Sequence, residues 1–224
     1  MAEHMDTAPV WAVYRETASE CPLCALAQQV ERGCVESFLG GSVMEPLMRI
    51  AVNEKGFCAQ HFLMLYDAGN RLGVALMADT YLKAVIAQVQ ARGAAPRRLL
   101  GKRAMPPLSD SCILCERLNQ TMARYGQTLA YLWAHEAAFR QAFAESKGVC
   151  LKHYDLLANL GDAKFQAALN EVTLAGFEQV ERDLAWFTQK FDYKNQAAPW
   201  GNSRDAVARA LVKLRGVCAT READ

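Results

Sequence analysis

Apolar residues along this chain recur mostly three and four positions apart, which is the spacing of α-helices, and strand-like alternation is scarce. One stripe predicts a long helix that ends near Arg92, before Gly93 and Pro96, and it consists of Leu72, Leu76, Leu82, Ile86 and Val89. A second stripe predicts a helix with Asp162 as its N-cap, and it consists of Phe165, Leu169, Val172, Val180, Leu184 and Phe187.

Shorter stretches predict further helices at about residues 25–38, 45–52, 58–66, 116–134, 135–144 and 150–159. Near the C-terminus, Val207, Leu211 and Leu214 mark the apolar side of a last helix that ends at Gly216. We therefore predict an all-α protein.

Four pairs of metal-ligand residues interrupt this helical pattern. Two are CxxC pairs and two are GxCxxH motifs, over residues 56–61 and 148–153. The eight candidate metal ligands are Cys21, Cys24, Cys58, His61, Cys112, Cys115, Cys150 and His153.

The spacing of these pairs repeats along the chain. Between Cys24 and Cys58 lie 33 residues, and between Cys115 and Cys150 lie 34. Such self-similarity is typical of an internal duplication. We predict two similar helical halves, residues 12–93 and 112–190, joined by a linker (94–111) and followed by a C-terminal clasp and tail (191–224).

Each half offers three thiols and one imidazole, a complete tetrahedral shell for zinc. We predict that Cys21, Cys24, Cys58 and His61 form one site. The second half supplies the other predicted site, formed by Cys112, Cys115, Cys150 and His153. In this interpretation each CxxC pair lies in a tight turn, and each CxxH pair lies in the first turn of a helix. A saturated shell leaves no position for a substrate water, which argues against zinc hydrolase chemistry.

Three alternatives stay open for these eight residues. They could hold an iron–sulfur cluster with one histidine ligand, although most clusters use four cysteines or another histidine arrangement. They could form a redox switch, with Cys21–Cys24 and Cys112–Cys115 disulfides after metal release. They could also be core residues without a metal.

Two further sets of polar residues are candidates for a role. Asp79 and Glu171 fall 92 residues apart, at matching places in the two halves. They could orient the metal-bound histidines, or they could be partly exposed residues at the edges of the apolar stripes. Glu45 and Arg49 precede the first CxxH motif and have no counterpart in the second half.

Charge and composition narrow the class of protein. The chain has 25 basic and 24 acidic residues in 224, a formal net charge of +1, which predicts no binding to nucleic acid or to an anionic membrane. We find no uninterrupted apolar run of about 18 residues and no secretory signal, so we expect a cytoplasmic protein.

The chain resembles an uncharacterised bacterial family of cytoplasmic proteins, known only as a domain of unknown function. Stretches that carry the resemblance are residues 21–24, 44–49, 56–61, 71–76, 191–193 and 199–201. The resemblance supports the metal sites and implies no activity.

These observations predict two zinc ions as structural cofactors. The function we expect is a zinc-stabilised binding or adaptor protein for a protein partner, with no enzymatic activity. One alternative is a thiol-based redox or zinc sensor. Another is an enzyme whose pocket lies between the halves and uses Glu45, Arg49 or Asp79.

Overall fold

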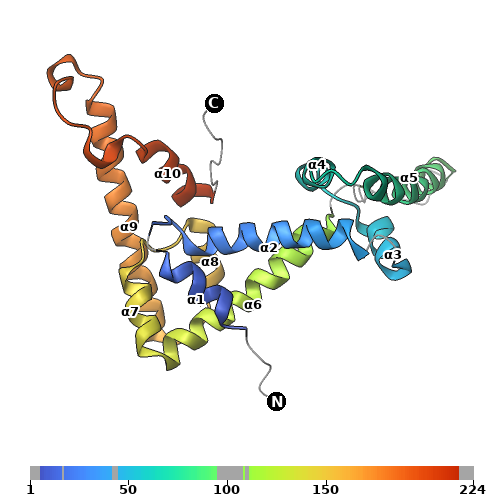
Figure 1. Ribbon diagram of the computed structural model, residues 1–224, viewed down its shortest axis with the longest axis horizontal. Coiled ribbons are helices and arrows are strands. Elements are labelled where there is room, and N and C mark those ends of the chain that lie inside the picture. Colours follow the sequence, from blue (N-terminus) through green and yellow to red (C-terminus); the bar gives the residue numbers. More distant parts are fainter. Residues whose placement is uncertain (1–5, 17, 42–44, 95–107, 109–110, 217–224) are drawn as a thin grey trace. The chain divides into compact units, whose positions relative to one another are not determined.

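A computed structural model describes residues 6–16, 18–41, 45–94, 108 and 111–216, and these residues contain helices and no strand (Figure 1). The α-helices are α1 (Ala8–Arg15), α2 (Pro22–Leu39), α3 (Pro46–Lys55), α4 (Ala59–Asp67), α5 (Arg71–Ala94), α6 (Ile113–His135), α7 (Ala137–Glu145), α8 (Leu151–Leu157), α9 (Ala163–Gln189) and α10 (Ala206–Arg215). Two short 3-10 helices, η2 (Tyr193–Asn195) and η3 (Gly201–Ser203), connect α9 to α10. The all-α prediction is confirmed.

Most of the helices lie where the apolar spacing places them, with two differences. Helix α1 was not predicted, because its eight residues are too few to show a repeated apolar spacing. Helices α2 and α6 begin at Pro22 and Ile113 rather than near residues 25 and 116, so Cys24 and Cys115 lie in helical first turns rather than in tight turns. Proline at the first helical position costs no hydrogen bond, which explains the start of α2 at Pro22.

The chain forms two compact units that do not follow the predicted halves. Unit 1 consists of Met1–Gln28 and Met122–Asp224, and unit 2 of Gln29–Thr121. Unit 2 is therefore inserted into the sequence of unit 1, and both α2 and α6 contribute residues to the two units. The predicted linker, residues 94–111, lies almost wholly outside the described residues, and the duplication of the halves stays a prediction.

Unit 1 is built around an aromatic core that joins helices distant in sequence. Tyr14 of α1 stacks on Phe143 of α7 with ring centroids 5.8 Å apart, and Phe143 lies 5.9 Å from Phe165 of α9. Trp11 meets Phe139 edge-on at 5.1 Å. These rings are mostly buried, so packing of α1 and α9 on α7 organises this unit.

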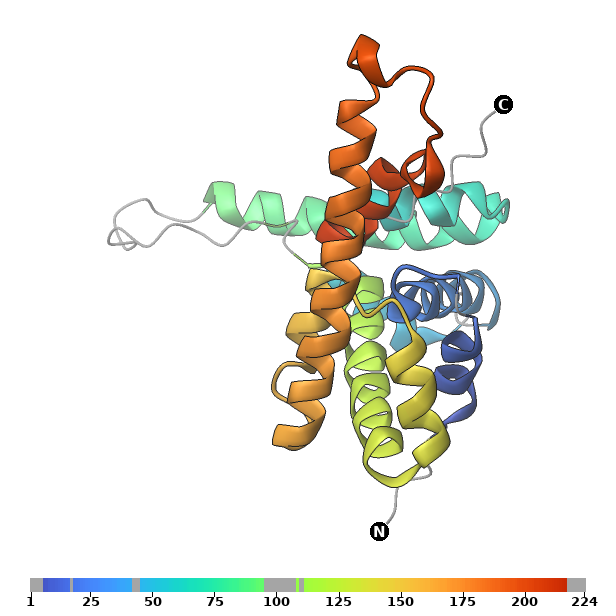
Figure 2. The same cartoon turned by 90° about the vertical axis from the view of Figure 1, so that its left-hand side faces the viewer.

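The chain turns after α9 and returns along it as α10, which packs against α9 and α8 (Figures 1 and 2). The buried side of α10 carries Ala206, Ala210 and Lys213. Its larger apolar residues, Val207, Leu211 and Leu214, are 45–54% exposed, so the predicted packing side of this helix is wrong. Small side chains let α10 approach α9 closely, which apolar spacing alone does not show.

Unit 2 packs α3 and α4 against α5. Its core lies under these helices and consists of Val35, Phe38, Leu39, Val52, Phe57, Leu65, Met77, Cys112 and Leu114. Only the first half of α5 takes part in this core. From Ile86 to Gly93 its residues are exposed, apart from the half-buried Arg92.

Over residues 71–93, helix α5 is long and apolar enough to cross a membrane, judged by length and composition alone. The absence of a long uninterrupted apolar run predicted no such segment, because Asp79 and Lys83 interrupt this one.

Candidate metal centres

The eight predicted ligands form two groups, but each CxxC pair meets the CxxH pair of the other half. In unit 1, Cys21 and Cys24 lie with Cys150 and His153; in unit 2, Cys58 and His61 lie with Cys112 and Cys115. The prediction that each half closes a site of its own is therefore wrong. The ligand residues themselves are the predicted ones.

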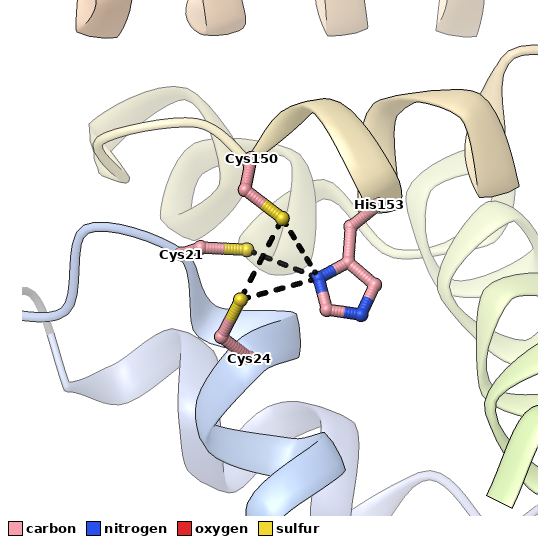
Figure 3. A group of neighbouring side chains, drawn as sticks. All are labelled: Cys21, Cys24, Cys150 and His153. Atoms are coloured by element: carbon pink, nitrogen blue, oxygen red, sulfur yellow. Dashed lines mark hydrogen bonds between the residues drawn. The ribbon is translucent and has the colours of Figure 1, made fainter. Parts of the chain in front are cut away.

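In the unit 1 centre the four side chains converge from the start of α2 and the start of α8 (Figure 3). The Nδ1 atom of His153 lies 3.4 Å from Cys21 Sγ, 3.4 Å from Cys24 Sγ and 3.3 Å from Cys150 Sγ. Cys24 Sγ lies 3.6 Å from Cys150 Sγ. All four residues are buried.

The unit 2 centre has the same set of donors at the starts of α4 and α6. The Nδ1 atom of His61 lies 3.2 Å from Cys58 Sγ, 3.2 Å from Cys112 Sγ and 3.4 Å from Cys115 Sγ. Cys58 Sγ lies 3.8 Å from Cys115 Sγ. Here His61 and Cys112 are buried, whereas Cys58 and Cys115 are only half-buried.

These distances fit a tetrahedral metal ion. With Zn–S bonds of about 2.3 Å and Zn–N bonds of about 2.0–2.1 Å, the edges of a tetrahedron are about 3.8 Å between sulfurs and about 3.6 Å between sulfur and nitrogen. The observed sulfur–sulfur distances of 3.6 and 3.8 Å are also far longer than a disulfide bond of about 2.05 Å. Both groups can therefore hold metal ions, and their donor atoms are consistent with zinc.

Each centre lies where two helices begin. Cys58 and Cys150 are the N-cap residues of α4 and α8, with nearly the same backbone angles (φ −72°, ψ 166° and φ −78°, ψ 166°). Cys21 and Cys112 directly precede α2 and α6. The free N–H groups at a helix start favour negative charge, so two helix starts stabilise the thiolates of each centre.

The glycines before the CxxH pairs are required by their backbone conformation. Gly56 has a φ of 62° and Gly148 a φ of 76°, in the left-handed region. A Cβ atom at Gly148 would lie 2.7 Å from the carbonyl oxygen of Val172 and 2.8 Å from the Cα of Thr173. Gly148 therefore lets the loop before Cys150 pass directly against the backbone of α9.

An ion pair joins the two ligand loops in both centres. Lys55, which precedes Gly56, contacts Glu116, which follows Cys115. Lys147, which precedes Gly148, lies 2.8 Å from Glu20, which precedes Cys21. Each lysine places a positive charge near the thiolates and also holds the loop of the opposite ligand pair.

Unit 1 has an additional buried cation, Lys213 of α10. Its side chain is 3% exposed, and its Nζ donates 2.8 Å to the carbonyl oxygen of Glu20 and also to the carbonyl oxygen of Lys147. Burial lowers the pKa of Lys213, an effect that the neighbouring Glu20 and Cys21 oppose. Lys213 thus fastens the loops that carry Cys21 and Cys150 to each other.

The end of α10 also covers this centre. Gly216 ends the helix in the left-handed conformation, with a φ of 67°. A side chain at this position would begin 3.3 Å from Cys24 Sγ and 3.5 Å from Cys150 Sγ. The sequence pattern predicted Gly216 as a helix stop, but no local signal places Gly216 or Lys213 beside the sulfurs.

The thiols of each group influence one another's protonation. In unit 1, burial raises the pKa of Cys21 to about 12, and hydrogen bonds from Cys21 and Cys24 hold the pKa of Cys150 well below its usual range. In unit 2, burial raises the pKa of Cys115 to about 12. A metal ion that binds all three thiolates must therefore displace protons, so metal binding strengthens as pH rises.

A carboxylate does orient one metal-binding histidine, but it is neither of the two predicted. Glu31 Oε1 lies 3.0 Å from His61 Nε2, and its side chain is 18% exposed. Asp79 instead pairs with Lys83 at 2.7 Å on the exposed side of α5, and Glu171 is exposed as well. Their role as histidine partners is wrong, and both residues are exposed, as the alternative interpretation expected. Glu31 lies 30 residues from His61 in the sequence, so no local signal marks it as the partner of this histidine.

Comparison with known proteins identifies the family of this chain but assigns it no activity. An uncharacterized 23.9 kDa protein in the xynA 3' region of Caldicellulosiruptor sp. (strain Rt8B.4) is 21% identical over 176 residues, which cover 78% of this chain and 84% of that protein. No solved structure matches the chain significantly. The sequence profile of the family described as "Family of unknown function (DUF6062)" matches residues 1–221. The chain, with its two crossed groups of three cysteines and one histidine, therefore belongs to this family of unknown function.

Proposed function

We propose that the protein is a zinc-stabilised helical binding protein whose two metal ions are structural and whose role is to engage a protein partner. The observation that carries the proposal is the saturation of both centres. Each group supplies four protein donors at tetrahedral distances. A zinc ion bound by four protein ligands has no open position for a substrate, in contrast to catalytic zinc with three.

The positions of the ligands also support a structural role. The unit 1 centre connects Cys24 to Cys150, which are 126 residues apart, and so joins the two separate segments of unit 1. The unit 2 centre connects Cys58 to Cys115, 57 residues apart. Metal binding by such sites contributes on the order of 10 kcal/mol or more, most of it available to folding.

Elemental analysis and a visible spectrum of the purified full-length chain test the metal. We expect two equivalents of zinc per chain and no colour, with loss of cooperative unfolding after treatment with a strong chelator. Brown protein with visible absorbance would instead indicate an iron–sulfur cluster in place of zinc. Unchanged thermal unfolding after complete metal removal would contradict the structural role.

A groove in unit 2 supports the binding role. It has a volume of about 330 Å³ beside α3, and its lining combines apolar residues with charges of both signs. Leu47, which is 80% exposed, and Glu45 line the groove, as do the paired side chains of Lys55 and Glu116. An apolar groove bordered by charged residues is typical of a protein-binding surface.

The groove is tested with the tagged full-length chain expressed in its native host. We expect a defined partner to co-purify with the wild-type protein and to be lost with Leu47→Glu. The matched control is Leu174→Glu, which changes another exposed leucine (58%) in unit 1 and should retain the partner. Equal recovery with both variants would remove the groove from the proposal.

A second candidate is a thiol sensor, favoured by the half-buried sulfurs of Cys58 and Cys115. Oxidation by a peroxide would take two electrons from these two thiolates, form one disulfide, reduce the peroxide to water and release the ion. Cys58 Sγ and Cys115 Sγ lie 3.8 Å apart, close enough to bond after a small shift. Unit 1, whose ligands are all buried, would keep its metal.

Mild peroxide treatment in the presence of a zinc-binding dye separates the two candidates. The sensor requires release of one equivalent of zinc and a Cys58–Cys115 disulfide in the peptide map. Retention of both equivalents with unreacted thiols would eliminate the sensor and leave the structural role.

A further inference from the structure

Helix α5 carries a heptad pattern on its exposed side. The exposed residues Leu72, Ala75, Asp79, Leu82, Ile86 and Val89 follow one another at alternating spacings of three and four. We call these six residues the heptad stripe. They form one face of the helix, and the alternation is that of the a and d positions of a coiled coil.

The heptad stripe is strongly exposed. Leu72 is 70% exposed, Leu82 60%, Val89 53% and Ile86 48%. The rest of the first half of this helix is already covered by packing, because Met77 is buried and Val74, Leu76 and Tyr81 pack against the unit 2 core. A strict a/d stripe is narrower than the apolar face of a core helix and is typical of a seam between two helices.

We propose that the heptad stripe is a self-association surface, on which α5 of a second copy of this chain packs in antiparallel orientation. The α5 helix has 24 residues and is about 36 Å long, enough for three heptads. The proposal rests on α5 alone and does not depend on the role of the metal centres.

The residues of the heptad stripe select the antiparallel orientation. About a two-fold axis near the middle of the helix, Leu72 meets Val89, Ala75 meets Ile86, and Asp79 meets Leu82 of the second copy. Each layer then combines one larger with one smaller or polar side chain. A parallel pair would instead place Asp79 against Asp79 and Ala75 against Ala75, which gives one repulsive layer and one poorly filled layer.

Charge complementarity at the centre of the pair favours the same register. Asp79 pairs with Lys83 in its own helix at 2.7 Å. In the antiparallel register Lys83 of the second copy comes next to the same carboxylate, so two acids and two lysines alternate. At the ends, Arg71 approaches Arg92 of the second copy, but the Arg71 guanidinium is already held 3.3 Å above the ring of Tyr66.

A lipid bilayer is the competing occupant of this surface, since α5 has the length and composition of a spanning helix. Insertion would carry Asp79 and Lys83 to the middle of the hydrocarbon, where each charge costs several kcal/mol. In a seam between two helices Asp79 keeps its ion pair with Lys83 beside the stripe, and neither charge enters hydrocarbon. The observations therefore favour a second copy of the chain.

The test compares the full-length protein with two variants by sedimentation velocity over a range of concentrations. Ile86→Glu adds a charge within the heptad stripe, and Gln88→Glu adds the same charge to an exposed position outside it. We expect wild type and Gln88→Glu to form dimers with similar dissociation constants. Ile86→Glu should raise the dissociation constant at least about a hundredfold, because the substitution occurs twice in each dimer. Metal content, measured in parallel, shows that each variant is folded.

Charge exchange and cross-linking test the orientation. Asp79→Lys should weaken the dimer, and Asp79→Lys with Lys83→Asp should restore it. A benzoylphenylalanine in place of Leu72 should cross-link to the peptide that contains Val89. A cross-link to the peptide around residue 72, a monomeric wild type, binding of the monomer to vesicles through α5, or a dimer that survives Ile86→Glu would each overturn the proposal.

Discussion

The two metal centres have the same donors and the same helix starts, but they differ in how their ligand loops are joined. In unit 2 the loops meet directly: the Ile113 amide donates 3.1 Å to the Gly56 carbonyl oxygen, and the Ser111 hydroxyl donates 2.8 Å to the Lys55 carbonyl oxygen. In unit 1 the buried Lys213 of α10 joins the two loops, because its Nζ donates to a carbonyl oxygen in each of them.

The two centres can also be compared by the length of chain that each ion closes and by the burial of their ligands. The longer separation of the unit 1 ligands adds only about 0.7 kcal/mol of loop-closure free energy, so loop length does not distinguish the centres. Burial does: all ligands in unit 1 are buried, and two in unit 2 are half-buried. The unit 1 centre is part of a packed core, and the unit 2 centre lies nearer to solvent.

Removing one ligand from each centre should give the largest effects. We expect Cys150→Ser to lose one equivalent of metal together with the cooperative unfolding of unit 1, because on the order of 10 kcal/mol of metal-linked folding energy is lost. Cys58→Ser should lose the other equivalent and unfold unit 2. Metal stoichiometry and calorimetry measure both, and loss of both ions from either single variant would show that the centres are not independent.

The paired glycines should differ in their tolerance of alanine. Gly148→Ala places a Cβ against the backbone of α9, which cannot move, so we expect a loss of about 3 kcal/mol or more. At Gly56 the obstacle is the hydroxyl end of Tyr81, a side chain that can turn away. Gly56→Ala should therefore cost about 1–2 kcal/mol, mostly from its positive φ. Equal losses in chemical denaturation would contradict this account.

The lysines beside the centres provide a third comparison. Lys213→Met removes a buried ammonium and leaves the carbonyl oxygens of Glu20 and Lys147 without their donor, so we expect unit 1 to lose about 2–4 kcal/mol. Lys55→Met breaks a partly exposed ion pair in unit 2 and should cost less than about 1 kcal/mol. Thermal unfolding checks both, and a larger effect of Lys55→Met would reverse the assignment.

The last comparison concerns the histidine of unit 2, where the expected effect is on metal affinity. Glu31→Gln replaces the carboxylate that holds His61 Nε2 by a neutral amide and should weaken metal binding at this centre by about 10–100-fold. Chelator competition measures the two affinities separately, with the unit 1 centre as the internal reference. Asp79→Asn is the matched control and should leave both affinities unchanged, because Asp79 pairs with Lys83.

Local spacing predicted the parts of the molecule that depend on neighbours in sequence. The helices, the eight ligands, and the CxxH pairs in the first turns of α4 and α8 all follow from contacts three or four residues apart. The positive φ of Gly56 and Gly148 is also a local property, because glycine adopts this conformation without steric cost.

Only the tertiary structure decided which ligand pairs share an ion. Three cysteines and one histidine satisfy the metal equally well in either pairing, because coordination chemistry depends on donor atoms and not on chain order. The path of the chain brings Cys150 to Cys24 rather than to Cys115, since unit 2 is inserted within unit 1. Glu31 and Lys213 were missed for the same reason: each acts on a group distant in sequence, and no local pattern encodes such a contact.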